Sequence, residues 1–377
     1  MIREKKTRKR LAPHEAEALG FDVKSPIPTE VETNTNPRYY LTIEQHHKLI
    51  DIRKNYIGNT PLSIKGTSTL KDGQGNVLLE WVKTDVQEQD RLEALRVAID
   101  ALKEDIEPAA PLKKSKKKTN SKLINQYLVT DMHLAMLAWG EEAGDDYDMK
   151  VAEDILINFF TQGIESSPNA DEAILAQLGD FLHFDGLQAV TPMNKHILDA
   201  DTRFTKLVRT AIRLIRSIIS MLLAKYNKVT LIMAEGNHDM ASSVWLREVF
   251  HSFYAKEPRL TVDTNPDPYY CVTFGKVCLF YHHGHLRNLS NIDSVLVAKF
   301  KEEFGNSKFV FAHTGHKHHK QVKETNLMIL EQHRTLSAKD SYASRGGWIS
   351  GRDSSVITYH KEYGEVSRQT INIDILR

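Results

Sequence analysis

The sequence predicts an α/β protein: a layered sheet sandwich flanked by helices, with a small N-terminal α+β appendage. Two observations predict this class. From about residue 123 onward, short apolar runs that suit strands alternate with longer stretches of helical periodicity. The runs are apolar at consecutive positions, which is typical of strands that other layers cover on both faces. Before residue 123 the chain is more polar, which indicates a separate module.

Composition places the chain among ordinary globular proteins. Its 377 residues are enough for two domains, or for one large α/β domain with appendages. Hydrophobic residues make up 41% of the chain and charged residues 26%, both usual fractions. The formal net charge of +1 gives no global reason to expect a nucleic acid partner.

Cysteine content and hydropathy bear on the compartment. Cys271 and Cys278 fall in "YYCVTFGKVCLFYHH", which predicts two strands joined by a turn at Gly275-Lys276. A disulfide framework is therefore not expected, and the low count fits a reducing compartment. No apolar run approaches about 18 residues, and no apolar segment follows the N-terminal charges. The sequence thus predicts a cytoplasmic protein without a membrane span or signal peptide.

The chain before residue 123 is expected to have three parts. Residues 1–40 predict a polar arm, because "SPIPTE" and "TNTNP" favour an extended or poorly ordered chain. Residues 41–110 predict a helical and hairpin module, and residues 111–122 predict a basic linker. Residues 123–377 then form the main domain.

Local signals predict three elements within the module. Thr42 opens "TIEQHHKLIDIRKNY" with Gln45 three residues later, a capping box that predicts a short helix. Apolar residues on both sides of Asp72-Gly73 predict a hairpin. A second helix is expected over about 85–106, where apolar residues recur at steps of three and four. That apolar stripe could pack on the main domain or on another subunit.

Basic charge is concentrated at two places. Residues 1–10 hold six Lys or Arg against one Glu, and "PLKKSKKKTNSK" within 111–122 holds six lysines and no acidic residue. Such runs are usually solvated tails or linkers, and the alternative is a contact with nucleic acid. A protein partner or self-association through the module is a further expectation, whereas a membrane contact is not expected.

The main domain is expected to alternate strands and helices. Strands are predicted at "INQYLVT", "AILAQLG", "KVTLIMAEG", "VCLFYHH" and "KFVFAHT". Helical patterns cover about residues 148–164, 202–226, 243–254 and 291–304. The stretch "SSVITYHKEYGEVSRQTINI" alternates and turns at Gly364, which predicts a closing antiparallel pair.

Five predicted strands end in side chains that can bind metals or move protons. They are Asp131 and His133, Asp180, Asn237 and His238, His282, His283 and His285, and His316 and His318. In open α/β sheets, ligands bind outside the carboxyl ends of the strands. Since nothing in turn chemistry requires five such endings, their common position favours a functional site.

Each ending also has a structural interpretation. In "TLIMAEGNHDMASS", Gly236 and Asn237 favour a tight turn, and the residues after them could open a helix. Asp131 and His133 could be a helix cap and a surface histidine, and Gly-Asp at Asp180 is a common turn. Taken one at a time, the motifs leave these alternatives open.

The residue types suit divalent metal ions. Carboxylate, amide and imidazole ligands without thiolates suit manganese, iron, zinc or similar ions. Asp131 and His133 lie on the same face of an extended segment, so both can reach one ion. The Asp180 carboxylate has two oxygens and can bridge two ions, and Asn237 adds a neutral oxygen.

The order of the motifs resembles a known family. D-x-H, G-D, G-N-H-D, H-G and G-H-x-H follow one another over roughly residues 123–320. This series resembles the calcineurin-like metallophosphoesterase family, which includes protein phosphatases, cyclic nucleotide phosphodiesterases and SbcD-type nucleases. With its N-terminal appendage, the chain is also similar to phosphoesterases of phage and prophage genomes. The resemblance implies a sandwich of the metallophosphoesterase type over 123–377 and a dinuclear metal-dependent hydrolase.

The resemblance further implies ligand sets for two divalent ions. One ion would be held by Asp131, His133, Asp180 and His318, and the other by Asp180, Asn237, His283 and His316. Manganese is the ion that the resemblance favours, and iron, zinc, nickel, cobalt and magnesium are the alternatives.

The resemblance also implies roles for residues beside the ligands. His238 would donate a proton to the leaving group, and Asp239 would orient it. His283 is taken as the ligand, because His stands directly before Gly in the family pattern, and His282 as structural. The other polar neighbours either line the pocket or have no assigned role: His183 and Asp185 after the second motif, and His313 and His319 outside G-H-x-H.

Together these residues predict a two-metal site that activates water to hydrolyse a phosphodiester. The basic runs favour nucleic acid as the substrate, and hence a nuclease. Hydrolysis of a phosphomonoester, in a phosphoprotein or a small molecule, is the alternative among enzymes. A non-catalytic binding module on the same fold is the alternative outside them, although the complete ligand set argues against it.

Overall fold

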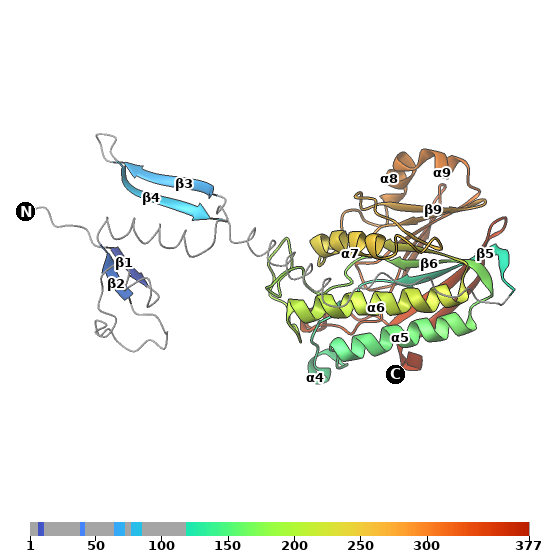
Figure 1. The fold of residues 1–377 in the computed structure, drawn as a ribbon, viewed down its shortest axis with the longest axis horizontal. Helices are drawn as coiled ribbons and strands as arrows, with labels where there is room; N and C mark the ends of the chain where they lie inside the picture. Colours follow the sequence, from blue (N-terminus) through green and yellow to red (C-terminus); the bar gives the residue numbers. More distant parts are fainter. Residues whose placement is uncertain (1–6, 11–37, 42–63, 72–76, 85–117, 377) are drawn as a thin grey trace, which may run out of the picture. The chain divides into compact units, whose positions relative to one another are not determined.

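The computed structural model describes residues 7–10, 38–41, 64–71, 77–84 and 118–376 (Figure 1). By its contacts the chain divides into two compact units, Met1–Glu88 and Gln89–Arg377. Each unit has its own sheets, and the second one holds all five predicted motifs.

The first unit contains two antiparallel strand pairs. β1 (Thr7–Arg10) pairs with β2 (Arg38–Leu41), and β3 (Ile64–Lys71) pairs with β4 (Val77–Thr84). The β3–β4 pair confirms the hairpin predicted around Asp72-Gly73. The β1–β2 pair was not predicted, because it falls almost wholly within residues 1–40, for which the sequence predicted a polar arm. The two predicted helices, most of the predicted arm and residues 111–117 of the linker lie outside the described residues.

The second unit is built on a six-stranded sheet with the order β15-β14-β5-β6-β7-β8. β5 to β8 are parallel, and the closing pair β14–β15 is antiparallel as predicted. β5 begins three residues before the predicted domain boundary at 123. The bounds are β5 Asn120–Val129, β6 Ala170–Gln177, β7 Lys228–Met233, β8 Leu260–Val262, β14 Asp353–His360 and β15 Gly364–Asn372.

A five-stranded sheet packs against the first, with the order β12-β13-β11-β10-β9. β10, β11 and β13 are parallel, and the edge strands β9 and β12 are antiparallel to their neighbours. The bounds are β9 Tyr270–Phe274, β10 Val277–Tyr281, β11 Phe309–Thr314, β12 Gln321–Glu324 and β13 Ile329–Gln332. Cys271 on β9 and Cys278 on β10 are free thiols, in line with the absence of a disulfide framework.

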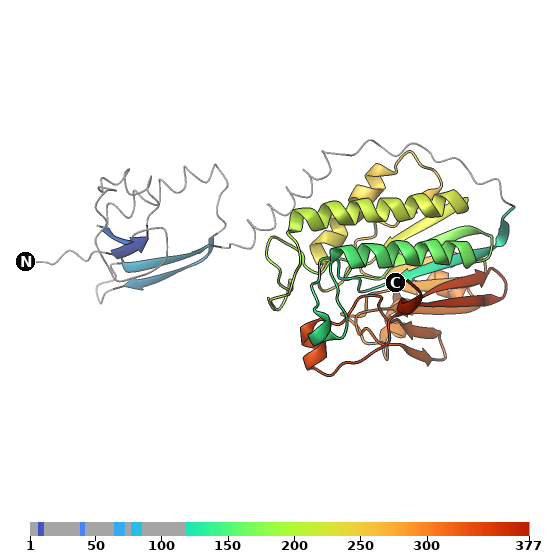
Figure 2. The ribbon, with the colours of Figure 1, turned by 90° about the horizontal axis from the view of Figure 1, so that it is seen from below.

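Alternation along the strands explains the layers. On β5, Ile124 and Leu128 belong to the apolar core between the two sheets, whereas Tyr127 and Val129 belong to the core beneath the helices. Helices α5 (Met149–Ser166) and α6 (Phe204–Lys225) run side by side over the outer face of the six-stranded sheet (Figures 1 and 2). These two sheets flanked by helices confirm the predicted fold class.

The remaining helices complete this arrangement. α7 (Met240–Phe253) packs against β7 and β8 and shares the apolar core of α5 and α6, and α8 (Ile292–Lys299) covers the outer face of the five-stranded sheet. The short helices are α4 Gly140–Ala143, α9 Lys301–Gly305, α10 Ser341–Arg345 and α11 Ile373–Leu376. Within the described part of the chain, no helix is long and apolar enough to cross a membrane.

Candidate metal centre

The five motifs meet at the carboxyl ends of β5, β6, β7, β10 and β11. Two motif glycines permit their close approach. A Cβ on Gly236 would lie 1.9 Å from Oδ1 of Asp180, and one on Gly315 would lie 1.9 Å from Oγ1 of Thr130. Any side chain at either position would therefore push the strand ends apart.

Asp131, His133 and His318 form the first group of ligand atoms. Nε2 of His318 lies 3.0 Å from Oδ1 of Asp131 and 3.4 Å from Nε2 of His133. One ligand atom from each residue lies within 4.8 Å of the other two. Asp131 and His133 are buried, so the group offers oxygen and nitrogen donors in a place largely screened from water.

Asp180, His283 and His316 form the second group, again within 4.8 Å of one another. Nε2 of His283 lies 3.1 Å from Oδ2 of Asp180, 3.2 Å from Oδ1 of Asn237 and 3.9 Å from Oδ1 of Asp131. His283 thus lies next to both groups. All seven residues that the motifs predicted as ligands are neighbours, and their donor set fits divalent ions.

Backbone conformation sets the predicted ligands apart. Seven non-glycine residues have positive φ in the part of the chain that the structure describes, and five of them are predicted ligands. The φ angles are 53° at Asp131, 44° at His133, 50° at Asp180, 71° at His316 and 55° at His318. Such conformations cost about 1–3 kcal/mol each and persist where the surroundings impose them, typically at functional sites.

The protonation states suit ligation. Burial raises the pKa of Asp131, but His318 and His283 outweigh it and hold that pKa well below its usual range. Burial lowers the pKa of His316 to about 4, so its imidazole is neutral at pH 7. Burial also lowers the pKa of His283, but the carboxylates of Asp180 and Asp131 outweigh burial and raise this pKa above its usual value, to about 9. Metal binding at His283 would therefore release a proton.

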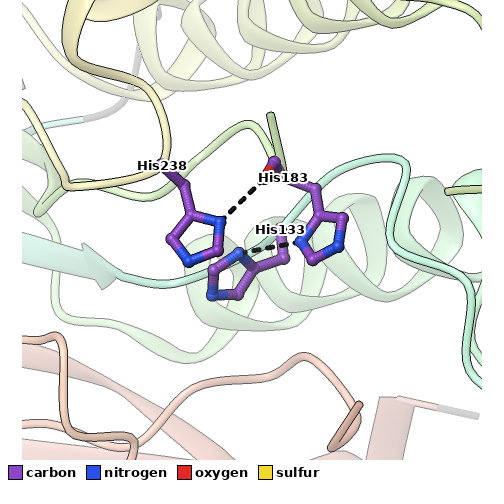
Figure 3. A group of neighbouring side chains, drawn as sticks. All are labelled: His133, His183 and His238. Atoms are coloured by element: carbon purple, nitrogen blue, oxygen red, sulfur yellow. Dashed lines mark hydrogen bonds between the residues drawn. The ribbon is translucent and has the colours of Figure 1, made fainter. Parts of the chain in front are cut away.

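His238, the predicted proton donor, lies at the edge of this centre. Its Nδ1 lies 2.8 Å from the backbone carbonyl of His183, and its ring packs against those of His133 and His183 (Figure 3). Asp239, expected to orient His238, instead accepts hydrogen bonds from the backbone N–H groups of Phe181 (2.7 Å) and Gly236 (2.9 Å). The carbonyl of His183 is thus the partner that orients the His238 ring.

Asp239 joins the loop after β6 to the loop after β7 through these backbone hydrogen bonds. Burial raises its pKa to about 7, with Asp180 and Asp185 adding to the rise, and its backbone hydrogen bonds oppose it. Asp185 accepts hydrogen bonds from the N–H groups of Ala241 and Ser242, both at 2.7 Å. It therefore caps α7 from outside, because the N-cap residue Asp239 makes no side-chain cap bond.

The other histidines of the motif regions are distributed as follows. His282 stacks on Tyr269 with its ring centroid 4.6 Å away and accepts a hydrogen bond from the N–H of Gly284, which agrees with a structural role. His319 is exposed. His313 is buried and contacts His333, Nδ1 to Nε2, at 2.9 Å.

Sequence reasoning missed two contributors to the centre. Thr335 Oγ1 donates a hydrogen bond of 2.7 Å to the backbone carbonyl of Asp131, from 204 residues away. His285, quoted in a motif but given no role, packs 5.3 Å from the His283 ring, and its two buried nitrogens have no hydrogen-bond partner among the described residues. A second His after H-G was the only signal for His285, and nothing near Thr335 marked it.

Comparison with known proteins gives matches in solved structures alone. No protein-family model and no curated protein matches the sequence. An archaeal phosphodiesterase is 12% identical with a TM-score of 0.33, covering 66% of this chain and 99% of its own. A predicted phosphoesterase from Streptococcus pneumoniae is 12% identical with a TM-score of 0.27, covering 67% and 97%. Zinc-bound Vps29 from Entamoeba histolytica is 9% identical with a TM-score of 0.26, covering 67% and 99%.

Two of these three structures are described as phosphoesterases.

Proposed function

We propose that this chain is a metal-dependent phosphoesterase whose centre holds two divalent ions. The observation that carries this proposal is the pair of adjoining ligand groups, Asp131, His133 and His318 beside Asp180, His283 and His316. Asp180 would also contribute to the first set, and Asn237, beside His283, to the second. Nitrogen and oxygen donors without sulfur suit manganese, with iron, zinc, nickel, cobalt and magnesium as alternatives.

Two such ions, when bound, supply a hydroxide near neutral pH and hold the phosphoryl oxygens for in-line displacement. The chain itself contributes negatively charged ligands and a histidine that can donate a proton. The carboxylates of Asp131 and Asp180 balance the positive charge of the ions. The His183 carbonyl accepts a hydrogen bond from Nδ1 of His238 and leaves Nε2 to face the leaving oxygen; the imidazolium form, which is protonated on both nitrogens, would give its Nε2 proton to that oxygen.

Nucleic acid is the substrate that we propose, which makes the chain a nuclease or a related phosphodiesterase. The basic runs within 1–10 and 111–122 support it, since Lys and Arg neutralise backbone phosphates.

The test compares the wild type with Asp180→Ala. It measures Mn²⁺-dependent hydrolysis of bis(p-nitrophenyl) phosphate, p-nitrophenyl phosphate and labelled single- and double-stranded DNA. We expect the wild type to cleave the diester and DNA. We expect Asp180→Ala to lose this cleavage and both bound ions. Cleavage of the monoester alone would replace the proposal by a phosphomonoesterase. Two bound ions without turnover on any substrate would favour a binding module.

The proton donor has a separate test. His238→Ala is expected to keep both ions and to lose about 10²- to 10⁴-fold in turnover, the usual contribution of a general acid. Metal content and kcat are measured on the same preparation. Loss of metal in this variant would contradict the assignment, because His238 would then be part of the ligand structure.

A further inference from the structure

His183 contacts two residues of the proposed centre without belonging to either ligand set. It is 1% exposed. Its Nδ1 lies 3.3 Å from Nδ1 of His133, and its backbone carbonyl lies 2.8 Å from Nδ1 of His238 (Figure 3). His183 thus contacts Nδ1 of the proposed ligand His133 and Nδ1 of the proposed proton donor His238.

Two ring nitrogens in hydrogen-bond contact hold one proton between them, so one donates and the other accepts. Nε2 is the nitrogen that His133 turns toward His318 of the first ligand group, so the proton of a metal-binding His133 belongs on Nδ1. That Nδ1–H then points at Nδ1 of His183. Nδ1 of a neutral His183 is then an acceptor, and His133 is the donor.

The direction of this bond decides which nitrogen of His133 can bind a metal. With its proton on Nδ1, His133 keeps a lone pair on Nε2, the atom that lies 3.4 Å from Nε2 of His318. His238 follows the same rule, because a carbonyl accepts only from an N–H and so fixes the proton on Nδ1.

We propose that His183 is a positioning residue that accepts the Nδ1–H of His133 with its ring and the Nδ1–H of His238 with its carbonyl. The part that concerns His238 rests on the proposed function, whereas the part that concerns His133 needs only a metal site. Partners of this kind orient a ligating histidine and raise its basicity.

Two variants separate the ring of His183 from its carbonyl. His183→Phe keeps an aromatic ring in the buried space and keeps the carbonyl, but leaves His133 without an acceptor. His183→Asn brings an amide oxygen near the place of Nδ1 and restores an acceptor. His251→Phe, at an exposed position on α7, is the matched control.

Two readouts follow these variants. Calorimetric titration with Mn²⁺ alone gives affinity and stoichiometry, and ¹⁵N–¹H correlation NMR of the metal-free protein gives the tautomer of His133. In His183→Phe we expect affinity to fall roughly 10- to 100-fold at unchanged stoichiometry, with the proton of His133 moving from Nδ1 toward Nε2. His183→Asn and His251→Phe are expected to resemble the wild type.

Two outcomes would overturn the proposal. Loss of one bound ion in both His183 variants would make His183 a ligand itself, since ligand atoms of His133, His183 and His238 lie within 4.8 Å of one another. An unchanged tautomer and affinity in His183→Phe would remove any positioning role. A wild type that binds Mn²⁺ but hydrolyses no phosphoester would refute the proposed function and leave the His183 result readable.

Discussion

Among the described residues, metal-ligating side chains gather at two buried places, which differ in what those side chains already bind. The candidate metal centre has two groups of three, and the buried network has His313, Glu331 and His333, also within 4.8 Å of one another. In the buried network, Arg368 binds both carboxylate oxygens of Glu331, at 2.6 and 2.7 Å. Nε2 of His313 lies 3.0 Å from the hydroxyl of Tyr359.

The comparison teaches that residue types and spacing do not by themselves define a metal site. In the buried network an arginine already neutralises the carboxylate, and the imidazoles already contact other groups. None of its three residues has positive φ, whereas five of the seven predicted ligands at the candidate metal centre do. Backbone strain at the ligands, and carboxylates that pair with imidazoles instead of an arginine, therefore mark the place where an external ion has a function.

The largest expected effect is on Mn²⁺ affinity, which should depend on the candidate metal centre and not on the buried network. Asp131→Asn keeps the shape of the side chain and tolerates positive φ, but removes a negative charge from the centre. We expect it to lower Mn²⁺ affinity by more than about 100-fold, beyond the effect usual for outer partners of a ligand. Glu331→Gln, the matched variant in the buried network, is expected to leave affinity and stoichiometry unchanged.

Calorimetric titration and metal analysis after dialysis measure both variants. Equal loss of metal in Asp131→Asn and Glu331→Gln would break the comparison, because the buried network would then hold an ion as well.

The sequence predicted the residues of the candidate metal centre, but it did not predict the buried network or how it differs from that centre. Each predicted ligand directly follows an apolar strand, so the motif order was enough to bring Asp180 and His283 to one edge. His313 precedes His316 by three residues, and no local signal assigned it to the other place. Its burial against Tyr359 depends on β14, which the sequence places far along the chain.

Contacts made by backbone atoms or by distant residues stayed beyond sequence reasoning. The orienting partner of His238 is a carbonyl of His183, and a carbonyl carries no residue identity. Thr335 reaches Asp131 across 204 residues. The four helical stretches predicted in the main domain, in contrast, agree with the observed bounds to within about three residues, because their apolar periodicity is local. The stretch over 291–304 is nevertheless divided into α8 and α9, and the short helices α4, α10 and α11 were not predicted.

The next effect concerns stability and the arginine that closes the buried network. Arg368→Met leaves Glu331 buried without its main partner. Breaking a fully buried pair costs about 3–5 kcal/mol, and because the Arg368 side chain is 24% exposed we expect about 2 kcal/mol. Urea unfolding at pH 7 measures the free energy of unfolding. Arg213→Met, which breaks an exposed pair with Glu153, is the control and is expected to cost at most about 1 kcal/mol.

Equal losses in the two arginine variants would show that Glu331 is stabilised by something other than Arg368. Removing the charge as well, in Arg368→Met with Glu331→Gln, is expected to recover part of the lost stability, since no unpaired carboxylate remains.

The smallest effect is the pH dependence of that same pair. Burial raises the pKa of Glu331, but His333 and Arg368 outweigh it and hold the pKa at about 2. Since the folded-state pKa lies below the unfolded value of about 4.3, the pair stabilises the protein at neutral pH and loses this contribution as the pH falls through that range. The difference in unfolding free energy between wild type and Arg368→Met should therefore shrink by about 1 kcal/mol between pH 7 and pH 3.5. Urea unfolding at several pH values measures this difference, with Arg213→Met as the reference. A difference that stays constant over this interval would mean that Arg368 acts through packing and not through the Glu331 charge.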